Sequence, residues 1–254
     1  MMKTELKVQK IAGVNIFSGS FKELIEFILN YRSNIMLSTL SFPLLGELKN
    51  NIDYKKALES SEIILPDGIG IIVLSTLTYG KNRIKNRIAG PDFFMEFNKI
   101  ANEKKISYFF LGSTKETLKR IEERIKKEYP QIIFKGYYSP PFGEWDKVEN
   151  EKILNKINEK KPDVLWVAMT APKQEIWVYK NREKLNAKLV ASVGATFDFF
   201  AGTKKRAPKL FQKTGFEWLH RTFQEPIRMG KRYLKGFPAF LCFLFKSIGK
   251  KSRK

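Results

Sequence analysis

Residues 164–177 read VLWVAMTAPKQEIW, and this stretch decides the class of fold. Its first five residues, Val164–Ala168, are apolar throughout, which is typical of a parallel strand covered on both faces. A polar segment and a helical pattern follow at once. Similar short apolar runs alternate with helical patterns along the chain, so the sequence predicts an α/β fold, a Rossmann-like and largely parallel sheet flanked by helices.

The alternation predicts strands and helices at definite places. Strands are expected at residues 8–17, 35–39, 62–65, 107–111, 132–137, 164–168 and 189–193. Helices are expected at residues 21–31, 43–49, 54–60, 69–78, 91–104, 115–128, 146–159 and 172–186, with two or three basic helices after residue 209.

Sheets of this kind bind ligands at the carboxyl ends of their strands. Candidate site residues therefore follow the predicted strands, at Thr39 and Ser41, Asp67, Gly112 and Ser113, 169–174, and 194–198. Asp67 either acts as a general base or caps the next helix. Arg87 either grips a diphosphate bidentately or is a surface charge.

The remaining strand ends also offer donors for an anionic ligand. The turn at Gly112 and Ser113 has two interpretations. Its backbone N–H groups hold a phosphate or a uracil ring, or the turn only caps the following helix. Gln174 lies at a helix N-terminus and can contact a sugar or base. Gly194 lets a ligand approach the backbone closely, and Arg206 is a candidate substrate-binding residue. Asp198 either binds a ligand or forms a structural ion pair with Arg206 or a neighbour.

The C-terminal residues 204–254 hold fifteen Lys and Arg and two acids, a net charge of +13 out of +21 for the 254-residue chain. Bulky apolar residues recur among these charges at helical spacing, which favours a membrane interface over nucleic acid. We therefore expect an α/β catalytic domain at residues 1–203 and a basic amphipathic helical appendage at 204–254 that docks on an anionic membrane. The apolar run 237–245 is about half the roughly 20 residues of a spanning helix.

Composition excludes several classes of site. The single cysteine, Cys242, excludes an intrachain disulfide and a CxxC zinc site. The single histidine, His220, argues against histidine triads and multi-histidine metal sites. The N-terminal residues lack the apolar core of a signal peptide, so none is expected.

Six motifs together resemble one enzyme family. They are PDGIGI (66–71), RIAGPDFF (87–94), FLGS (110–113), GYYSPPFG (136–143), APKQE (171–175) and VGATFDFFAGTKKRAPKLFQKTGFEWLHRTFQEPIRMGKRYL (193–234). With these motifs the chain resembles the WecG/TagA/CpsF glycosyltransferase family over about residues 35 to 235.

The resemblance implies an inverting hexosyltransferase that works as a peripheral protein at the cytoplasmic face of the membrane. It moves a sugar, N-acetylmannosamine or a relative, from a UDP-sugar to an undecaprenyl-diphosphate-linked N-acetylglucosamine, in teichoic acid or other cell-surface polysaccharide synthesis. No metal or other cofactor is expected, because the family is thought not to need one and the chain has no DxD motif. Homo-oligomerisation is left open.

The resemblance also implies roles for individual residues. Asp67 matches the proposed base, Thr39 a catalytic-site position, and Gln174 a glutamine near the donor. Ser41 stands where many members carry Asn, which leaves the donor sugar open. The tail arginines complete the site, Arg221 and Arg228 in catalysis and Arg232 in substrate binding; the alternative that they contact only lipid headgroups stays open. Pro226, between Arg221 and Arg228, is expected to interrupt the helix.

The composition is also compatible with two other classes of function. The pI of 9.9 suggests a nucleic-acid-binding protein, but the aromatic residues of the tail recur in helix-patterned segments and not on a sheet face. A non-catalytic membrane-associated α/β protein would not need Asp67, Gln174 and the small-residue strand ends together. No nucleic-acid partner is therefore expected.

Overall fold

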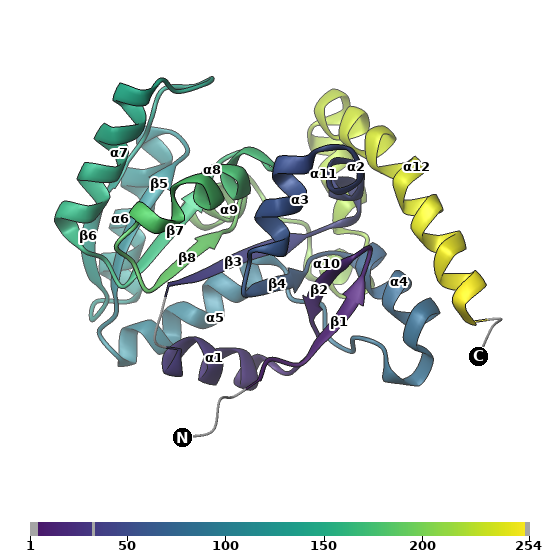
Figure 1. The fold of residues 1–254 in the computed structure, drawn as a ribbon. Helices are drawn as coiled ribbons and strands as arrows, with labels where there is room; N and C mark the ends of the chain where they lie inside the picture. The colour runs from purple at the N-terminus through teal and green to yellow at the C-terminus, as the bar shows by residue number, and fades with distance from the viewer. Residues whose placement is uncertain (1–4, 32–33, 252–254) are drawn as a thin grey trace. The chain divides into compact units, whose positions relative to one another are not determined.

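The computed structural model describes residues 5–31 and 34–251. It contains a six-stranded sheet, a separate two-stranded hairpin and helices along the whole chain (Figure 1). The α/β class predicted from the sequence is thereby confirmed. Among the described residues, no helix combines the length and the apolar character needed to cross a membrane.

The strands agree with the predicted positions to within a residue or two, apart from the first. They are β1 (Val8–Ile11), β2 (Val14–Phe17), β3 (Ile35–Leu40), β4 (Ile63–Pro66), β5 (Ser107–Gly112), β6 (Ile133–Tyr138), β7 (Val164–Ala168) and β8 (Leu189–Ser192).

Three short 3₁₀ helices, η1 (Phe42–Leu44), η2 (Gly80–Asn82) and η3 (Arg182–Lys184), accompany the α-helices. The α-helices are α1 (Phe21–Asn30), α2 (Leu45–Asn50), α3 (Ile52–Glu59), α4 (Ile69–Tyr79), α5 (Gly90–Glu103), α6 (Lys115–Glu128), α7 (Lys147–Lys160), α8 (Lys173–Asn181), α9 (Thr196–Ala201), α10 (Lys209–Thr214), α11 (Glu217–Gln224) and α12 (Pro226–Lys251).

The six-stranded sheet has the strand order β4-β3-β8-β7-β5-β6. The pairs β3–β8, β8–β7, β7–β5 and β5–β6 are all parallel. Their register matches Gly112 of β5 with Ala168 of β7, and Val167 of β7 with Ser192 of β8. The carboxyl ends of these three strands therefore lie at one edge of the sheet, where the sequence predicted the site.

Residues 8–17 were predicted as one strand, and this prediction is wrong. They form an antiparallel hairpin of β1 and β2, whose turn residues Ala12 and Gly13 have φ of 52° and 92°. Two consecutive residues with positive φ are typical of tight hairpin turns, and glycine adopts this conformation without strain. The pattern of apolar residues alone did not reveal the turn.

The described chain divides into two compact units, unit 1 with residues 5–27, 39–89 and 206–251, and unit 2 with 28–31, 34–38 and 90–205. The core of unit 2 is built around Trp166 of β7, which is fully buried. Its ring lies 4.8 Å from that of Phe94, 5.5 Å from Tyr108 and 5.9 Å from Phe97, measured between centroids. The apolar character of residues 164–168 follows from this burial.

In unit 1 the long helix α12, drawn in yellow in Figure 1, packs on η1, α2 and α4. Two glycines permit the close approach of the backbones. A Cβ atom on Gly46 would lie 2.6 Å from the carbonyl oxygen of Lys235, and one on Gly236 would lie 2.5 Å from the Cα of Pro43. The tail is thus packed against other elements of unit 1. Its docking on a membrane stays a prediction, as does the domain boundary at residue 203.

In the described part of the tail, up to residue 251, the chain forms the three helices α10, α11 and α12, where two or three were predicted. Helix α11 ends at Gln224 and α12 begins at Pro226, where the missing N–H of proline costs no intrahelical hydrogen bond. Arg221 and Arg228 therefore lie on different helices.

Candidate active site

In unit 1 the ends of β3 and β4 bring Thr39, Ser41 and Asp67 together. Thr39 is buried in β3, and the backbone N–H of Asp67 donates to the carbonyl oxygen of Leu40 at 2.9 Å. A Cβ atom on Gly68 would lie 3.9 Å from the Cβ of Ser41. The two segments after these strands are therefore neighbours.

Asp67 is not the N-cap residue of α4. Gly68 occupies that position with φ of 90°, a conformation that favours glycine, and the helix begins at Ile69. The alternative that Asp67 serves as this cap is therefore wrong. Its side chain is partly exposed at the end of a strand, which suits a general base that must reach a substrate.

Glu217 of α11 holds two of the arginines that the sequence assigned to substrate binding. Its carboxylate accepts from Arg87 Nη1 at 3.0 Å and from Arg206 Nε at 3.0 Å. The side chains are 17% exposed for Arg87, 18% for Arg206 and 13% for Glu217. Burial acts to raise the pKa of Glu217, but the hydrogen bonds and charges of Arg206 and Arg87 outweigh burial and lower this pKa. Arg87 is thus a paired, mostly buried group.

Tyr233 of α12 connects the tail to the strand ends. Its ring stacks on that of Phe42, with centroids 5.3 Å apart and planes at 14°, and meets the ring of Trp218 edge-on at 5.6 Å. Burial raises the pKa of its phenol to about 12. The charges of Arg221 and Arg232 act to lower this pKa, and the charges of Asp67 and Glu217 act to raise it.

These electrostatic effects place two tail arginines, Arg221 and Arg232, in the surroundings that Tyr233 shares with Asp67. Arg228 has a different neighbour, because its Nε donates to the carboxylate of Glu225 one turn earlier. Sequence analysis did not identify Glu217 or Tyr233, although the family motif that ends at Leu234 contains both.

In unit 2 the end of β5 requires glycine at position 112. Gly112 has φ of 105°, and a Cβ atom there would lie 2.2 Å from the carbonyl oxygen of Ala168. Ser113 also has a positive φ, of 59°, and its N–H donates to the same carbonyl oxygen at 3.1 Å. Thr114 then caps α6 by accepting from the N–H of Thr117, as one of the two sequence interpretations anticipated.

Gln174 lies at the start of α8, next to the end of β7. It is 2% exposed, accepts from the N–H of Met169 at 3.1 Å and donates to Glu175 Oε1 at 2.7 Å. A Cβ atom on Gly194 would lie 3.8 Å from its Nε2. Unit 2 thus gathers Gln174 and Gly194 at neighbouring strand ends. Asp198, in α9, forms an ion pair with Lys204 at 3.6 Å.

The loop that carries the motif GYYSPPFG is tied to two of these strand ends. Ser139 Oγ donates to the carbonyl oxygen of Ser113 at 2.7 Å. Lys173 donates to the carbonyl oxygen of Gly143, and its Nζ lies 4.1 Å from the centroid of the Trp145 ring. Burial lowers the pKa of Lys173. Lys173 is a further residue beside the site that sequence analysis left without a role.

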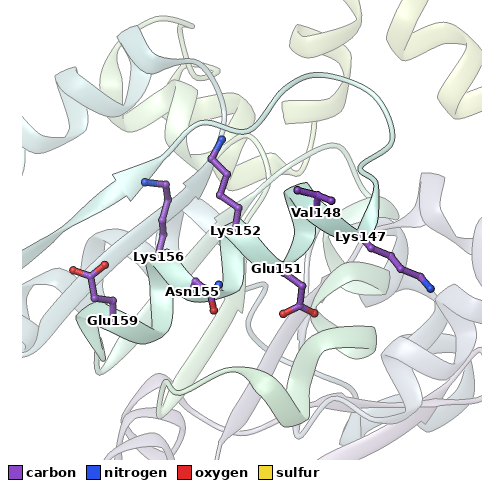
Figure 2. Close-up of a pocket in the computed structure, with 7 residues that line it drawn as sticks. All are labelled: Lys147, Val148, Glu151, Lys152, Asn155, Lys156 and Glu159. Carbon is purple, nitrogen blue, oxygen red and sulfur yellow. The ribbon is translucent and has the colours of Figure 1, made fainter.

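The structure also has a surface depression on α7. Figure 2 shows a surface depression lined by residues of α7 alone, namely Lys147, Val148, Glu151, Lys152, Asn155, Lys156 and Glu159. None of the residues predicted for the site lines it. Within residues 5–31 and 34–251, no group of three or more His, Cys, Asp or Glu side chains is arranged to hold a metal ion.

A parallel α/β sheet with a carboxylate and guanidinium groups gathered beyond its strand ends is typical of enzymes that act on anionic substrates. The chain belongs to the glycosyl transferase WecG/TagA/CpsF family, whose model matches residues 9–254, and it is therefore a glycosyltransferase. The family expected from the motifs is confirmed.

Three similar proteins carry the same name, N-acetylglucosaminyldiphosphoundecaprenol N-acetyl-beta-D-mannosaminyltransferase. The protein of Bacillus subtilis (strain 168) is 33% identical over 229 residues, which cover 89% of this chain and 86% of the relative. That of Bacillus spizizenii is 32% identical, with 79% and 74% covered. That of Staphylococcus aureus (strain MW2) is 27% identical, with 91% and 89% covered.

Proposed function

We propose that the protein transfers N-acetylmannosamine, or a closely related sugar, from a UDP-sugar to N-acetylglucosaminyl-diphosphoundecaprenol. The observation that carries this proposal is the similarity, over most of both chains, to relatives named for this transfer. The product enters teichoic acid or another cell-surface polysaccharide. Family membership disfavours the two alternatives, a nucleic-acid-binding protein and a non-catalytic membrane-associated protein.

In the proposed reaction Asp67 is the general base. Its carboxylate removes the proton from an acceptor hydroxyl, and the oxygen attacks the anomeric carbon of the donor sugar. The new C–O bond forms as the bond from that carbon to the UDP oxygen breaks, which inverts the configuration and releases UDP. Support comes from the position of Asp67, held by the Leu40 carbonyl beside Ser41 and Thr39.

The departing UDP gains negative charge as this bond breaks, and cationic groups stabilise that charge. We propose that Arg221 and Arg232 supply them, since their charges act on the surroundings shared by Tyr233 and Asp67. The expectation that no metal is needed rests on the family resemblance and on the missing DxD motif. Turnover that survives EDTA treatment would support it.

The place of action proposed is the cytoplasmic face of the membrane, with the protein attached peripherally through its basic tail. Large apolar side chains on α10 to α12 support this attachment, because Leu210, Phe223, Ile227, Leu234, Phe237 and Phe245 are all exposed. Basic residues lie between them along the same helices. Such a surface combines apolar burial with attraction to anionic lipid.

The test of the proposed function is UDP release from a panel of UDP-sugars, with a vesicle-borne N-acetylglucosaminyl-diphosphate lipid as acceptor. Mass spectrometry of the lipid product identifies the sugar transferred. Transfer that depends on the acceptor and is lost in Asp67→Asn supports the proposal. Failure to transfer sugar from every donor in the panel, by a folded wild-type protein, would contradict it.

A further inference from the structure

The packing of Tyr233 fixes where its ring lies. The ring is held between Phe42 and Trp218, and Phe42 also meets Phe240 at 5.5 Å. The backbone of α12 is fixed one turn further on, where Gly236 allows its approach to Pro43. Tyr233 therefore has a defined position, set by contacts on both sides of its ring and by the crossing of α12 with η1.

The same contacts bring Tyr233 to the strand ends that hold the base. Phe42, on which the ring stacks, directly follows Ser41, and Ser41 lies beside Gly68. Trp218, the other partner of the Tyr233 ring, directly follows Glu217. Glu217 forms ion pairs with Arg87 and Arg206. A continuous set of contacts therefore runs from Tyr233 to the segment of Asp67 and to the arginine cluster.

Packing alone does not require a hydroxyl at this position. The partners of the Tyr233 ring are the aromatic groups of Phe42 and Trp218, and phenylalanine would fill the same space. The phenol is subject to the charges of two carboxylates and two guanidinium groups. In the part of the chain that the structure describes, no protein group accepts a hydrogen bond from this hydroxyl. Tyr233 is partly exposed, and its hydroxyl is not one of the buried polar atoms that lack a partner, so a ligand can reach it.

We propose that Tyr233 is a substrate-binding residue whose hydroxyl donates a hydrogen bond to the acceptor sugar at Asp67. The inference rests on the proposed function, because the sugar that Asp67 deprotonates must lie against its carboxylate. With a pKa of about 12 the phenol stays protonated at neutral pH, so it acts as a donor. The guanidinium groups of Arg221 and Arg232 are then available to bind the diphosphate of the departing UDP.

The experiment compares Tyr233→Phe with the wild-type protein in steady-state assays that vary acceptor and UDP-sugar separately. The variant keeps the aromatic contacts and loses only the hydroxyl. The expected result is an acceptor KM about tenfold higher, the effect of one lost hydrogen bond, with the KM for the UDP-sugar unchanged. Tyr79→Phe is the matched control, since the Tyr79 hydroxyl bonds to the backbone of Lys10 and not to the site. Both KM values should stay at wild-type levels in this control.

The outcomes separate the inference from the proposed function. An active wild type with unchanged kinetics in Tyr233→Phe overturns the inference alone. A higher KM for the UDP-sugar, with the acceptor KM unchanged, overturns the assignment of Tyr233 to the acceptor. A wild-type protein that transfers no sugar overturns the proposed function and, with it, the inference.

Discussion

Asp67 is positioned by backbone contacts and not by a role in the next helix. Its N–H is bonded to the Leu40 carbonyl, and Gly68 takes the N-cap position. Asp67→Asn keeps the size of the side chain and removes the base. We expect turnover to fall by about 10²–10⁴ with the melting temperature unchanged, as measured by UDP release and thermal unfolding. Turnover close to that of the wild type would show that another group acts as base.

Arg221 is expected to act on the reaction beyond any contact with lipid. Its charge acts to lower the pKa of Tyr233, which burial raises and which the charge of Asp67 also acts to raise. Arg221→Lys keeps the charge but loses the planar group that can hold two phosphate oxygens. We expect kcat to fall about tenfold while vesicle binding stays unchanged. The companion variant Arg228→Lys tests the predicted catalytic role of Arg228; unchanged turnover in both variants would leave Arg221 and Arg228 with lipid contacts only.

Glu217 stabilises the fold in a way that depends on pH. Its pKa lies below the ordinary 4.5 in the folded chain, so its stabilising effect is complete above that value and is lost as the pH falls through the lowered pKa. Glu217→Gln leaves two half-paired guanidinium groups, and at pH 7 the free energy of unfolding should drop by about 2 kcal/mol. The difference from the wild type should shrink as the pH falls below about 4.5.

The matched control for Glu217 is Glu116→Gln, which breaks an exposed pair with Arg120 on α6. Such a pair contributes about 0.5 kcal/mol or less. Denaturant unfolding of both variants at several pH values measures the two effects. A Glu217→Gln variant as stable as the wild type at pH 7 would mean that the Arg87–Glu217–Arg206 cluster contributes nothing to the stability of the fold.

Single residues at strand ends could be predicted from the sequence, and their partners from the tail could not. Thr39 lies at the end of a strand that the apolar pattern reveals, and Ser41 and Asp67 follow such strands, so the topology of a parallel sheet brings them to one edge. Glu217 lies 130 residues from Arg87, and only the packing of the tail in unit 1 joins them. The sequence therefore offered Arg87 and Arg206 as candidates without showing the carboxylate that they share.

At the scale of elements, α12 depends on glycine where it crosses η1. A Cβ atom on Gly236 would lie 2.5 Å from the Pro43 Cα, and backbone cannot move aside cheaply. Gly236→Ala should lower the free energy of unfolding by about 1–3 kcal/mol and reduce turnover, because α12 carries Tyr233 and Arg232. Gly230→Ala, on the same helix with nothing within 4 Å, should instead stabilise the protein by about 0.4–1 kcal/mol. Thermal unfolding of the two variants measures this contrast. An equal loss of stability in both would contradict the close crossing of α12 and η1.

Element boundaries were predictable where the chain carries a strong local signal. Helix α6 covers the predicted residues 115–128, since Thr114 caps it and its apolar residues recur at helical spacing. Pro226 was expected to interrupt the tail, and α12 begins there. The hairpin of residues 8–17 was missed, because Ala12 and Gly13 are a weaker turn signal than Asn-Gly or Asp-Gly.

At the scale of the whole molecule, charge is distributed unevenly along the chain, with +13 of the +21 in residues 204–254. We expect binding to vesicles to require anionic lipid and to weaken with salt. Each basic residue near such a surface contributes on the order of 1 kcal/mol, within a Debye length of about 8 Å at physiological salt. Cosedimentation with neutral and with phosphatidylglycerol-containing vesicles, over a series of salt concentrations, measures both effects.

Two paired variants separate the charged from the apolar part of this binding. Lys231→Gln with Lys235→Gln removes exposed charge and should weaken binding at low salt, where screening is small. Ile227→Ser with Leu234→Ser removes side chains that are each 75% exposed, and it should weaken binding at low and high salt alike, because salt does not screen apolar burial. Equal binding of the wild type to neutral and anionic vesicles would contradict the electrostatic part. Unchanged binding of the serine variant at high salt would contradict the apolar part, and the attachment of the tail would then rest on its charge.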